Sequence, residues 1–563
     1  MRILKENGYN AVRSAHYPCS KALLDACDRM GMLMMDEYVD VWYIHKTKYD
    51  YAGQLADWWK QDLKDMVDKD YNHPSVIMYS TGNEVAETAQ EKGIALTGDM
   101  TNFLHSLDST RPVTCGINIF FNFLSSIGLG VYSDDKAEKS AGNAEKNAAQ
   151  ATGKNEKKVV KSGEKTVNKA TENGKKGLGS TKPEKKKKPV GSEFYNTLAC
   201  LVGDYFMKCG ATLYPCDLRT KDAYANMDIA GYNYGIFRYK HDLKKYPNRL
   251  ILGSETASTV SSRAVYKFPV EDKKGVKYED HQCSSYDVEV CPWSNIPDED
   301  FALADDHHWT IGQFVWTGFD YLGEPSPYDT DSWPNHSSMF GIIDLASLPK
   351  DRYYLYRSVW NKKAETLHIL PHWTWPGREG EVTPVFVYTN YPTAELFING
   401  KSYGKQSKNN SSLKNRYRLM WMDTKYEPGE VKVVAYDKNG KAVAEKVVCT
   451  AGKPHHIELV SNCNELTADG KDLAYVTVKV VDKDGNLCPA DNRQINFSVK
   501  GTGKYRAAAN GDPTNLEQFH LPKMHAFNGM LTAILQAGET AGEIVFTAKA
   551  NGVKAGNIRI QTK

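Results

Sequence analysis

The stretch Val76-Ile-Met-Tyr-Ser-Thr-Gly-Asn-Glu84 begins as an apolar run and ends in an amide and a carboxylate. A helical pattern precedes it, because residues 56–70 place four large apolar side chains on one stripe, namely Trp59, Leu63, Met66 and Val67. A helix followed by a short apolar strand is the repeating unit of a parallel sheet. The stretch therefore predicts one strand of such a sheet, with Asn83 and Glu84 at its carboxyl end.

The same alternation of helical patterns and short apolar runs extends from Met1 to about Trp360. Seven runs have the pattern of strands: 10–15, 32–37, 76–80, 113–116, 227–232, 250–254 and 311–316. A closed (β/α)8 barrel has eight strands, whereas this sequence starts with a helical pattern over residues 1–8. We therefore expect an α/β fold in which residues 1–362 form a (β/α)8 TIM barrel that is incomplete, with seven strands recognised.

Residues 133–192 interrupt the barrel pattern with a segment rich in Lys, Ala, Gly, Asn and Glu. Residues 133–190 carry 16 Lys against eight Asp and Glu, so the overall net charge of +2 conceals a basic segment. Such a composition buries too little apolar surface to fold, and we expect a disordered insertion on the carboxyl-terminal rim of the barrel. Because the segment lacks interleaved aromatic residues, we expect a solvated loop rather than a nucleic-acid site.

Beyond residue 362 the pattern changes to alternating strands and turns. Residues 431–436 precede the turn Asp437-Lys-Asn-Gly440, and residues 474–481 precede the turn Asp482-Lys-Asp-Gly485. Turns of this kind between apolar strands are typical of β-sandwiches of about 100 residues. We expect two immunoglobulin-like β-sandwich domains, over residues 363–453 and 454–563.

The composition narrows the class of protein. The 563 residues are 41% hydrophobic and 25% charged, as in globular proteins. No apolar run approaches the roughly 18–20 residues that cross a bilayer, and the first six residues lack the apolar core of a signal peptide. The eleven cysteines show no C-x-x-C spacing of a zinc or redox site. We expect neither a membrane nor a nucleic-acid partner, while the oligomeric state, a homo-oligomer included, stays open.

Barrel enzymes carry their active sites at the carboxyl ends of the strands. The polar and aromatic residues at these ends are Arg13, His16, Asp36, Glu37, Asn83, Glu84, Tyr234, Glu255, Trp316 and Asp320. Glu84 and Glu255 stand out because each follows a clearly apolar run. Two carboxyl groups in one pocket suit glycoside hydrolysis, at about 5–5.5 Å for a retaining mechanism and further apart for an inverting one. From the residues alone, a surface-loop or helix-capping role explains either carboxylate equally well.

Six segments, in this order along the chain, carry a family resemblance. They are Asn10-Ala-Val-Arg-Ser-Ala-His-Tyr-Pro18, Leu33-Met-Met-Asp-Glu37, Asn72 to Glu84, Gly231-Tyr-Asn-Tyr234, Gly253-Ser-Glu255 and Trp316-Thr-Gly-Phe-Asp320. Together they resemble glycoside hydrolase family 2, and the two C-terminal modules resemble those of its β-galactosidase branch. The resemblance extends over nearly all the chain except the lysine-rich insertion. It implies a retaining exo-glycosidase acting on terminal, non-reducing β-D-galactosides.

The resemblance also implies roles for single residues. Glu84 is expected to be the acid/base and Glu255 the nucleophile. The implied substrate-binding residues are Arg13 and His16 on the pocket floor, Asn83 at the sugar 2-hydroxyl, Tyr234 as a donor to the nucleophile, and Trp316 as an apolar platform. A structural ion pair is the alternative role for Arg13, and core packing is the alternative for Trp316.

Two departures from family motifs bear on cofactor and substrate. Some relatives bind magnesium through Glu-x-His, but Glu37-Tyr-Val39 lacks the His, so we expect no metal and no other cofactor. The family's β-glucuronidases recognise the sugar carboxylate with Asn-x-Lys, where this sequence has Asn335-His-Ser337. Without that cation a uronate loses a charge-assisted hydrogen bond. We expect a β-D-galactoside as the carbohydrate substrate, with a β-glucuronide, another neutral sugar or an inactive carbohydrate-binding fragment as alternatives.

Family members also carry an N-terminal sugar-binding jelly-roll, a first immunoglobulin-like domain and a first barrel strand, which this sequence lacks. An unclosed barrel exposes sheet edges, so we expect an N-terminally truncated chain that by itself is unstable or weakly active. Relatives are commonly periplasmic or secreted, but this chain has no signal peptide, and its compartment stays open.

Overall fold

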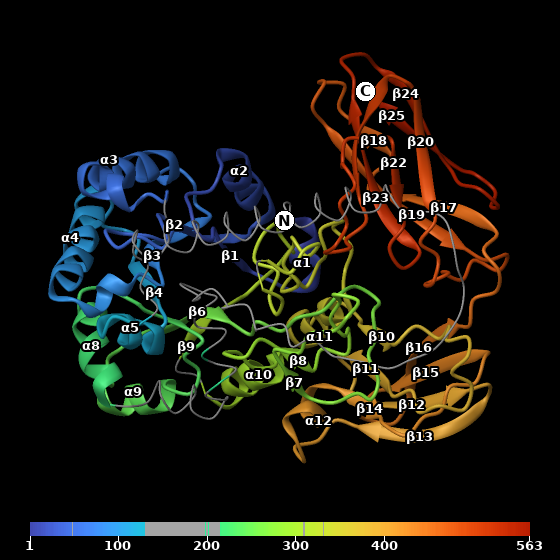
Figure 1. Cartoon of the computed structure of the whole chain (residues 1–563), viewed down its shortest axis with the longest axis horizontal. Coiled ribbons are helices and arrows are strands. Elements are labelled where there is room, and N and C mark those ends of the chain that lie inside the picture. The colour runs from blue at the N-terminus through green and yellow to red at the C-terminus, as the bar shows by residue number, and fades with distance from the viewer. Residues whose placement is uncertain (48, 130–197, 199–200, 202–213, 308–309, 330) are drawn as a thin grey trace, which may run out of the picture.

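A computed structural model describes residues 1–47, 49–129, 198, 201, 214–307, 310–329 and 331–563. Its first part is a seven-stranded parallel sheet in the order β1-β2-β3-β4-β5-β6-β9 (Figure 1). The strands are β1 (Ala11–Arg13), β2 (Leu33–Glu37), β3 (Val76–Asn83), β4 (Val113–Ile117), β5 (Ala230–Asn233), β6 (Ile251–Thr256) and β9 (Thr310–Val315). The edge strands β1 and β9 contact each other, which makes the sheet a nearly closed barrel. The predicted barrel and its seven strands are confirmed.

Helices surround this sheet (Figure 1). They are α1 (Arg2–Asn7), α2 (Lys21–Met30), α3 (Ala52–Asp70), α4 (Glu91–Leu107), α5 (Ile119–Ser126), α8 (Tyr214–Ala225), α9 (Tyr239–Lys245), α10 (Pro297–Asp306) and α11 (Asp351–Trp360), with a 3-10 turn, η1 (Ala86–Ala89), after β3. Helix α2 shows why they form where they do. The Ser20 side chain accepts a hydrogen bond from the Leu23 amide, and Gly31 ends the helix at φ 62.

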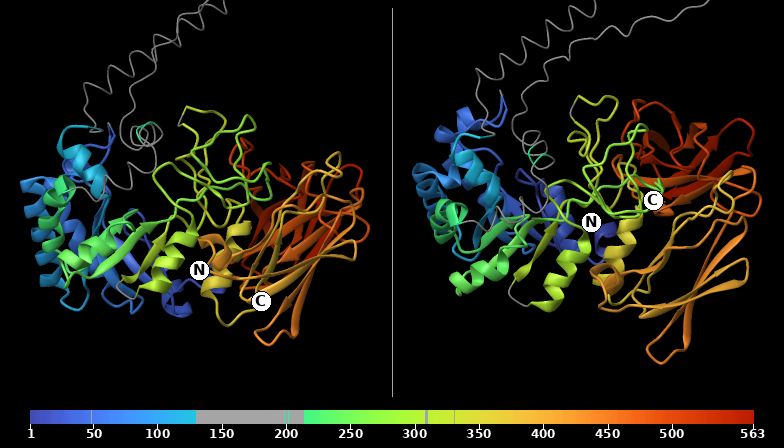
Figure 2. Two further views of the ribbon diagram at one scale, coloured as in Figure 1. Left: turned by 90° about the horizontal axis from the view of Figure 1, so that it is seen from below. Right: turned by 60° about the horizontal axis from the view of Figure 1, so that its bottom comes forward.

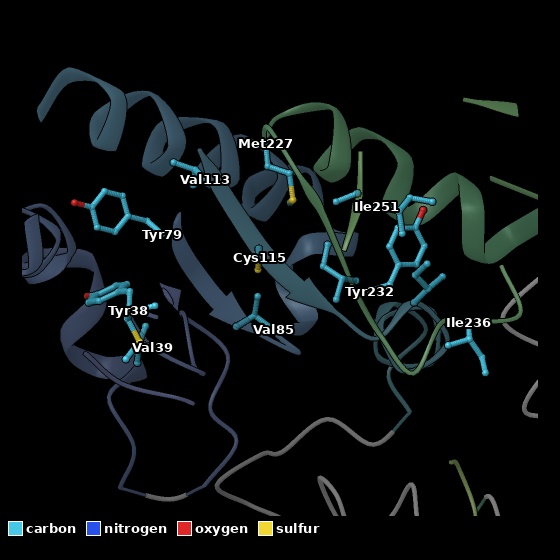
Figure 3. Packing of buried hydrophobic residues seen from close by; sticks show 14 of the residues in the cluster. Tyr38, Val39, Tyr79, Val85, Val113, Cys115, Met227, Tyr232, Ile236 and Ile251 are labelled. Carbon is cyan, nitrogen blue, oxygen red and sulfur yellow. The ribbon is translucent and has the colours of Figure 1, made fainter. Parts of the chain in front are cut away.

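The central barrel strands are buried on both faces, as expected of parallel strands covered by helices, whereas the edge strands β1 and β9 are half-buried or exposed. Every residue of β4, β5 and β6 is buried. Figure 3 shows Val113 and Cys115 near Tyr232 and Ile251 in one continuous core. This rigid core fixes the carboxyl ends of the strands, where the candidate site lies.

Two antiparallel β-sandwiches follow the barrel. The first packs the sheet β10-β11-β14 against the sheet β13-β12-β15-β16. Its strands are β10 (Leu367–Leu370), β11 (Val385–Thr389), β12 (Thr393–Ile398), β13 (Lys401–Ser407), β14 (Leu419–Trp421), β15 (Glu430–Tyr436) and β16 (Ala442–Cys449), with a short helix α12 (Leu413–Tyr417). Alternating burial along β12 and β15 gives each strand one core-facing side.

The second sandwich packs the sheet β17-β19-β23-β21 against the sheet β18-β25-β24-β20-β22, in which only the short β18–β25 pair is parallel. Its strands are β17 (His456–Ser461), β18 (Glu465–Leu466), β19 (Leu473–Val481), β20 (Gln494–Gly501), β21 (Gly503–Ala509), β22 (Lys523–His525), β23 (Met530–Ala537), β24 (Gly542–Lys549) and β25 (Gly556–Thr562). The predicted pair of β-sandwich domains is thus confirmed, while the exact boundaries at residues 362 and 453 stay predictions.

The barrel and the first sandwich share one hydrophobic core, which includes Phe386 and Tyr388 of β11. Both sandwiches lie on one side of the barrel in the two views of Figure 2. A fully buried ion pair between Arg418 and Asp298 of α10 also crosses this boundary. The loop between β6 and α10 packs here as well, and it contains the two-residue strands β7 (Lys273–Lys274) and β8 (Glu289–Val290).

Two further expectations concern parts of the chain outside the sheets. The lysine-rich insertion at 133–192 lies outside the described residues. Within the described ranges, every helix is too short or too polar to cross a bilayer.

Candidate active site

The predicted site residues come together at the carboxyl end of the parallel sheet. Arg13 ends β1, Asn83 ends β3 and is followed by Glu84, Tyr234 follows β5, and Glu255 is the second-last residue of β6. His16 and Trp316 come from the loops after β1 and β9. Since parallel strands end at the same edge of a sheet, residues far apart in the sequence meet there.

Arg13 links two carboxylates at the floor of the site. Its Nη1 lies 2.9 Å from Oε2 of Glu255, and its Nε lies 2.8 Å from Oε2 of Glu37. Its Nη2 donates to Oδ1 of Asn83 at 2.7 Å. Burial would raise the pKa of Glu37, but the charges of Arg13 and His16 hold that pKa at about 2. Arg13 therefore forms the ion pairs that its alternative role predicts, and one of its partners is Glu255, the expected nucleophile.

Glu255 accepts hydrogen bonds from three side chains. The Tyr234 hydroxyl donates to Oε1 at 2.6 Å, and Arg13 and Asn233 donate to Oε2 at 2.9 and 3.3 Å. The Tyr234 hydroxyl in turn accepts from Ser258 at 2.8 Å. The Glu255 carboxylate is therefore fixed in orientation by three donors from the ends of two strands, β1 and β5, and held beside a cation.

Glu84 has a different environment. Its Oε1 accepts hydrogen bonds from Asn118 at 3.1 Å and from Asn233 at 3.3 Å. Burial raises the pKa of Glu84, and the nearby charge of Glu255 raises it further, while Lys46 opposes this shift. Glu84 therefore holds a proton at higher pH than an ordinary glutamate does.

The Asn233 amide limits the distance between one oxygen of Glu84 and one oxygen of Glu255. One atom, Nδ2, lies 3.3 Å from Oε1 of Glu84 and 3.3 Å from Oε2 of Glu255. These two oxygens are therefore separated by at most twice that distance. The same Nδ2 donates to Oδ1 of Asn83 at 2.7 Å, so the four side chains form one connected cluster.

The backbone at two of these positions adopts a conformation that is uncommon for residues with a side chain. Glu84 has φ 47 and Tyr234 has φ 53, both in the left-handed region. Such strain persists only where the surrounding structure stabilises it, and it gathers at functional sites. Here it turns each side chain into the pocket just after a strand ends.

His16 and Trp316 form one wall of the site. Their rings stack with centroids 5.1 Å apart, and the Tyr321 ring meets Trp316 edge-on at 5.7 Å. His16 also bonds Oε1 of Glu37 through Nδ1 at 2.8 Å. Trp316 thus packs against two rings, in part as its alternative core-packing role predicts, but its side chain remains partly exposed.

Two other strand-end carboxylates point away from the site. Asp36 pairs with Lys69 of α3 at 2.7 Å, because its side chain lies on the opposite face of β2 from Glu37. Asp320 pairs with the buried Lys350 at 2.6 Å. Both are structural ion pairs.

The structure shows what stands at the positions of the magnesium motif and the uronate motif. The carboxylate of Glu37 forms hydrogen bonds with Arg13, His16 and Ser80. Among the described residues, no cluster of three or more His, Cys, Asp or Glu side chains is arranged to hold a metal ion. Ser337, which stands where the uronate-binding Lys would be, donates to the Tyr321 carbonyl at 3.2 Å.

Three residues of the site went unassigned in the sequence: Asn118, Asn233 and Glu324. Asn233 directly precedes Tyr234 in the motif Gly231-Tyr-Asn-Tyr234, and an amide at a strand end was a usable signal. Asn118 follows β4 in the same way. Glu324 lies in the loop after β9, where no strand-end rule applies. A cleft of about 840 Å³ elsewhere, between the barrel and both sandwiches, contains none of the predicted site residues.

Three parts of the chain match models of known protein families. The family model described as "Glycosyl hydrolases family 2, TIM barrel domain" matches residues 1–181. The model described as "Glycoside hydrolase family 2 C-terminal domain 5" matches residues 457–559. "Domain of unknown function (DUF4982)" matches residues 380–444.

Two curated proteins are similar over most of the chain. A β-galactosidase of Bacteroides ovatus is 35% identical, over 100% of this chain and 58% of that protein. A Formosa agariphila protein assigned by name to the β-glucuronidases is 30% identical, over 91% of this chain and 41% of that protein. The chain thus spans less than two thirds of the length of these relatives.

Solved structures agree with the sequence comparisons. A β-glycosidase from Bacteroides vulgatus has a TM-score of 0.72 at 26% identity, over 100% of this chain and 60% of that one. A family 2 member from Bacteroides cellulosilyticus has a TM-score of 0.71 at 28% identity, over 100% of this chain and 59% of that one.

Proposed function

Because this chain belongs to glycoside hydrolase family 2, we propose that it hydrolyses terminal, non-reducing β-D-galactosides with retention of anomeric configuration. One observation carries the proposal: a single amide of Asn233 bonds both Glu84 and Glu255. Twice 3.3 Å reaches only the lower limit of the roughly 6.5–9.5 Å range of inverting enzymes, so the contact favours the retaining range of about 5–5.5 Å.

The reaction has two displacement steps. In the first, a Glu255 oxygen attacks the anomeric carbon while the bond from that carbon to the glycosidic oxygen breaks. Glu84 gives its proton to the departing oxygen, and a galactosyl ester on Glu255 remains. In the second, Glu84 takes a proton from water, the water oxygen attacks the anomeric carbon, and the Glu255 carboxylate leaves. These steps use only the two side chains and water.

The environments of the two carboxyl groups suit these roles. An acid catalyst must be protonated when substrate binds, and the raised pKa of Glu84 favours that state. A nucleophile must be held in line with the anomeric carbon, and Glu255 is fixed by Tyr234, Arg13 and Asn233. Asn83, held by the same cluster, would bond the sugar 2-hydroxyl, and Trp316 with His16 would form a wall beside the sugar ring.

A neutral sugar is favoured over a uronate because Ser337 supplies no cation for a sugar carboxylate. Similarity to proteins named as β-glucuronidases makes a β-glucuronide the competing substrate. An inactive carbohydrate-binding protein is the competing class.

The test measures 4-nitrophenol release from 4-nitrophenyl β-D-galactoside and β-D-glucuronide by this chain. We expect a higher kcat/KM for the galactoside, with β-galactose as the first product in proton NMR. Preference for the glucuronide would replace the proposed substrate, and α-galactose as first product would contradict retention. Galactose binding without turnover would identify a binding protein instead.

Replacing Tyr234 with Phe removes the hydroxyl that orients Glu255. A hydrogen bond to a charged group contributes about 1.5–3 kcal/mol, so we expect kcat to fall about 10- to 100-fold with little change in KM. Steady-state kinetics on the 4-nitrophenyl galactoside measure both parameters. The exposed Tyr71→Phe is the matched control and should behave like the unmodified chain. A rise in KM at constant kcat would show that Tyr234 binds substrate rather than positions Glu255.

A further inference from the structure

The pocket contains another carboxyl group, Glu324, to which the proposed mechanism gives no role. It lies in the loop after β9, in the segment Tyr321-Leu-Gly-Glu-Pro325. Gly323 and Glu324 both have positive φ, 99 and 44, so the loop turns sharply at this point. Glu324 shares this left-handed backbone with Glu84 and Tyr234, which directly follow β3 and β5.

Glu324 is anchored to the aromatic wall of the site. Its Oε2 accepts a hydrogen bond from the Tyr321 hydroxyl. The Tyr321 ring meets Trp316 at 5.7 Å, and Trp316 stacks on His16 at 5.1 Å. This chain of contacts places the Glu324 carboxyl at the aromatic wall of the site, with its side chain partly open to solvent.

The charges of the site act on Glu324 directly. The pKa of Glu324 is raised to about 7, chiefly by burial; the Tyr321 hydrogen bond and His16 lower it, and Glu255 and Glu84 raise it. Four carboxyl groups thus gather here: Glu37, Glu84, Glu255 and Glu324. The cationic groups that act on these four carboxyl groups are Arg13, which Glu37 and Glu255 share, His16, which bonds Glu37, and Lys46, which lies 3.8 Å from Asp40 and donates to the Asn83 carbonyl.

One oxygen of Glu324 is available for a ligand. Tyr321 bonds Oε2, whereas Oε1 accepts no hydrogen bond from any residue that the structure describes. Above its pKa of about 7 the Glu324 carboxylate accepts strong hydrogen bonds from hydroxyl groups and repels another carboxylate. At the expected sugar site, the Glu324 carboxylate would therefore favour a sugar hydroxyl and disfavour a sugar carboxylate.

We propose that Glu324 is a substrate-binding residue that accepts a hydrogen bond from a hydroxyl of a neutral sugar and disfavours a uronate at the same position. This rests on the proposed glycosidase function and adds the group that rejects the competing substrate. Because Ser337 replaces the lysine, the site does not attract the carboxylate of a uronate, and the charge of Glu324 repels it.

Glu324→Gln tests this, because the amide keeps the shape and removes the charge. We expect kcat/KM for 4-nitrophenyl β-D-galactoside to fall about 10- to 100-fold, since a charge-assisted hydrogen bond is lost. The value for the β-D-glucuronide should fall less or rise, so the glucuronide-to-galactoside ratio increases at least about tenfold. Asp329→Asn makes the same charge change in the same loop, at a half-exposed residue that pairs with Lys277, and should leave the ratio unchanged.

Binding separates this proposal from the function on which it rests. Affinities of non-hydrolysable β-thiogalactoside and β-thioglucuronide are measured by calorimetry for the unmodified chain and for Glu324→Gln, with thermal melting to confirm folding. If neither 4-nitrophenyl substrate is hydrolysed, the proposed function fails while the ratio of affinities still reports on Glu324. An unchanged ratio in Glu324→Gln overturns the proposal. If Glu324→Gln does not fold, Tyr321→Phe takes its place, because it removes the hydroxyl that bonds the Glu324 carboxylate. The proposal then requires that Tyr321→Phe changes the ratio of the two affinities. An unchanged ratio overturns the proposal.

Discussion

Glu255→Gln is expected to abolish hydrolysis of β-D-galactosides while leaving sugar binding measurable. The glutamine retains the shape that accepts the hydrogen bond of Tyr234, but its amide cannot form the glycosyl ester. We expect kcat/KM for 4-nitrophenyl β-D-galactoside to fall by on the order of 10³-fold or more. Initial rates over a substrate series measure the loss, and calorimetry with a β-thiogalactoside measures the binding.

The control for this variant is Glu279→Gln, an exposed glutamate in the loop that follows β6. It should keep the activity of the unmodified chain. Near-normal hydrolysis by Glu255→Gln would show that another group is the nucleophile. Lost binding together with lost folding would show that the ion pair with Arg13 is needed mainly for structure.

Glu84→Ala is expected to affect substrates according to their leaving group. A poor leaving group needs a proton from Glu84, so hydrolysis of a disaccharide such as lactose should fall about 10²- to 10⁴-fold. A 2,4-dinitrophenyl galactoside needs no proton in the first step and should form the glycosyl ester at nearly the original rate. Adding azide, which replaces water without needing a base, should then yield β-galactosyl azide. Rates for the two substrates and mass spectrometry of the azide product measure these effects.

The pH dependence gives a separate check on Glu84. Burial and Glu255 raise its pKa, so the unmodified chain keeps the active, protonated acid to higher pH than an ordinary glutamate allows. Activity should fall as pH rises through that pKa, and this descending limb should be absent in Glu84→Ala with the dinitrophenyl substrate. The exposed Glu91→Ala is the control. A descending limb that persists in Glu84→Ala would assign the titration to another group.

The barrel strands could be read from the sequence because short apolar runs alternate with helical patterns, and this signal is local. Glu84 and Glu255 could be selected because each follows such a run. Asp36 and Glu37 could not be separated in this way. They are adjacent and lie on opposite faces of one strand, and only the positions of Lys69 and Arg13 decide which enters the pocket.

The remaining residues depend on contacts between distant segments. Asp320 stands at a strand end like the site residues, but Lys350, thirty positions later, pairs with it. Glu324 reaches the pocket through a turn with positive φ and the contact of Tyr321 with Trp316. No periodicity in the sequence encodes the Asp320–Lys350 pair or the turn at Glu324. The sequence therefore shows the family motif around Glu324 but does not indicate the role of Glu324.

The most direct test of the central claim, that Glu84 and Glu255 act as a retaining carboxylate pair on galactosides, is a trapping measurement. The chain is incubated with 2-deoxy-2-fluoro-β-D-galactosyl fluoride, which forms the glycosyl ester readily and hydrolyses it slowly, and is then digested and examined by mass spectrometry. We predict one fluorogalactosyl group per chain, on the peptide that contains Glu255, and none in Glu255→Gln. Absence of an adduct in the folded chain, or an adduct on any other residue, would contradict the account.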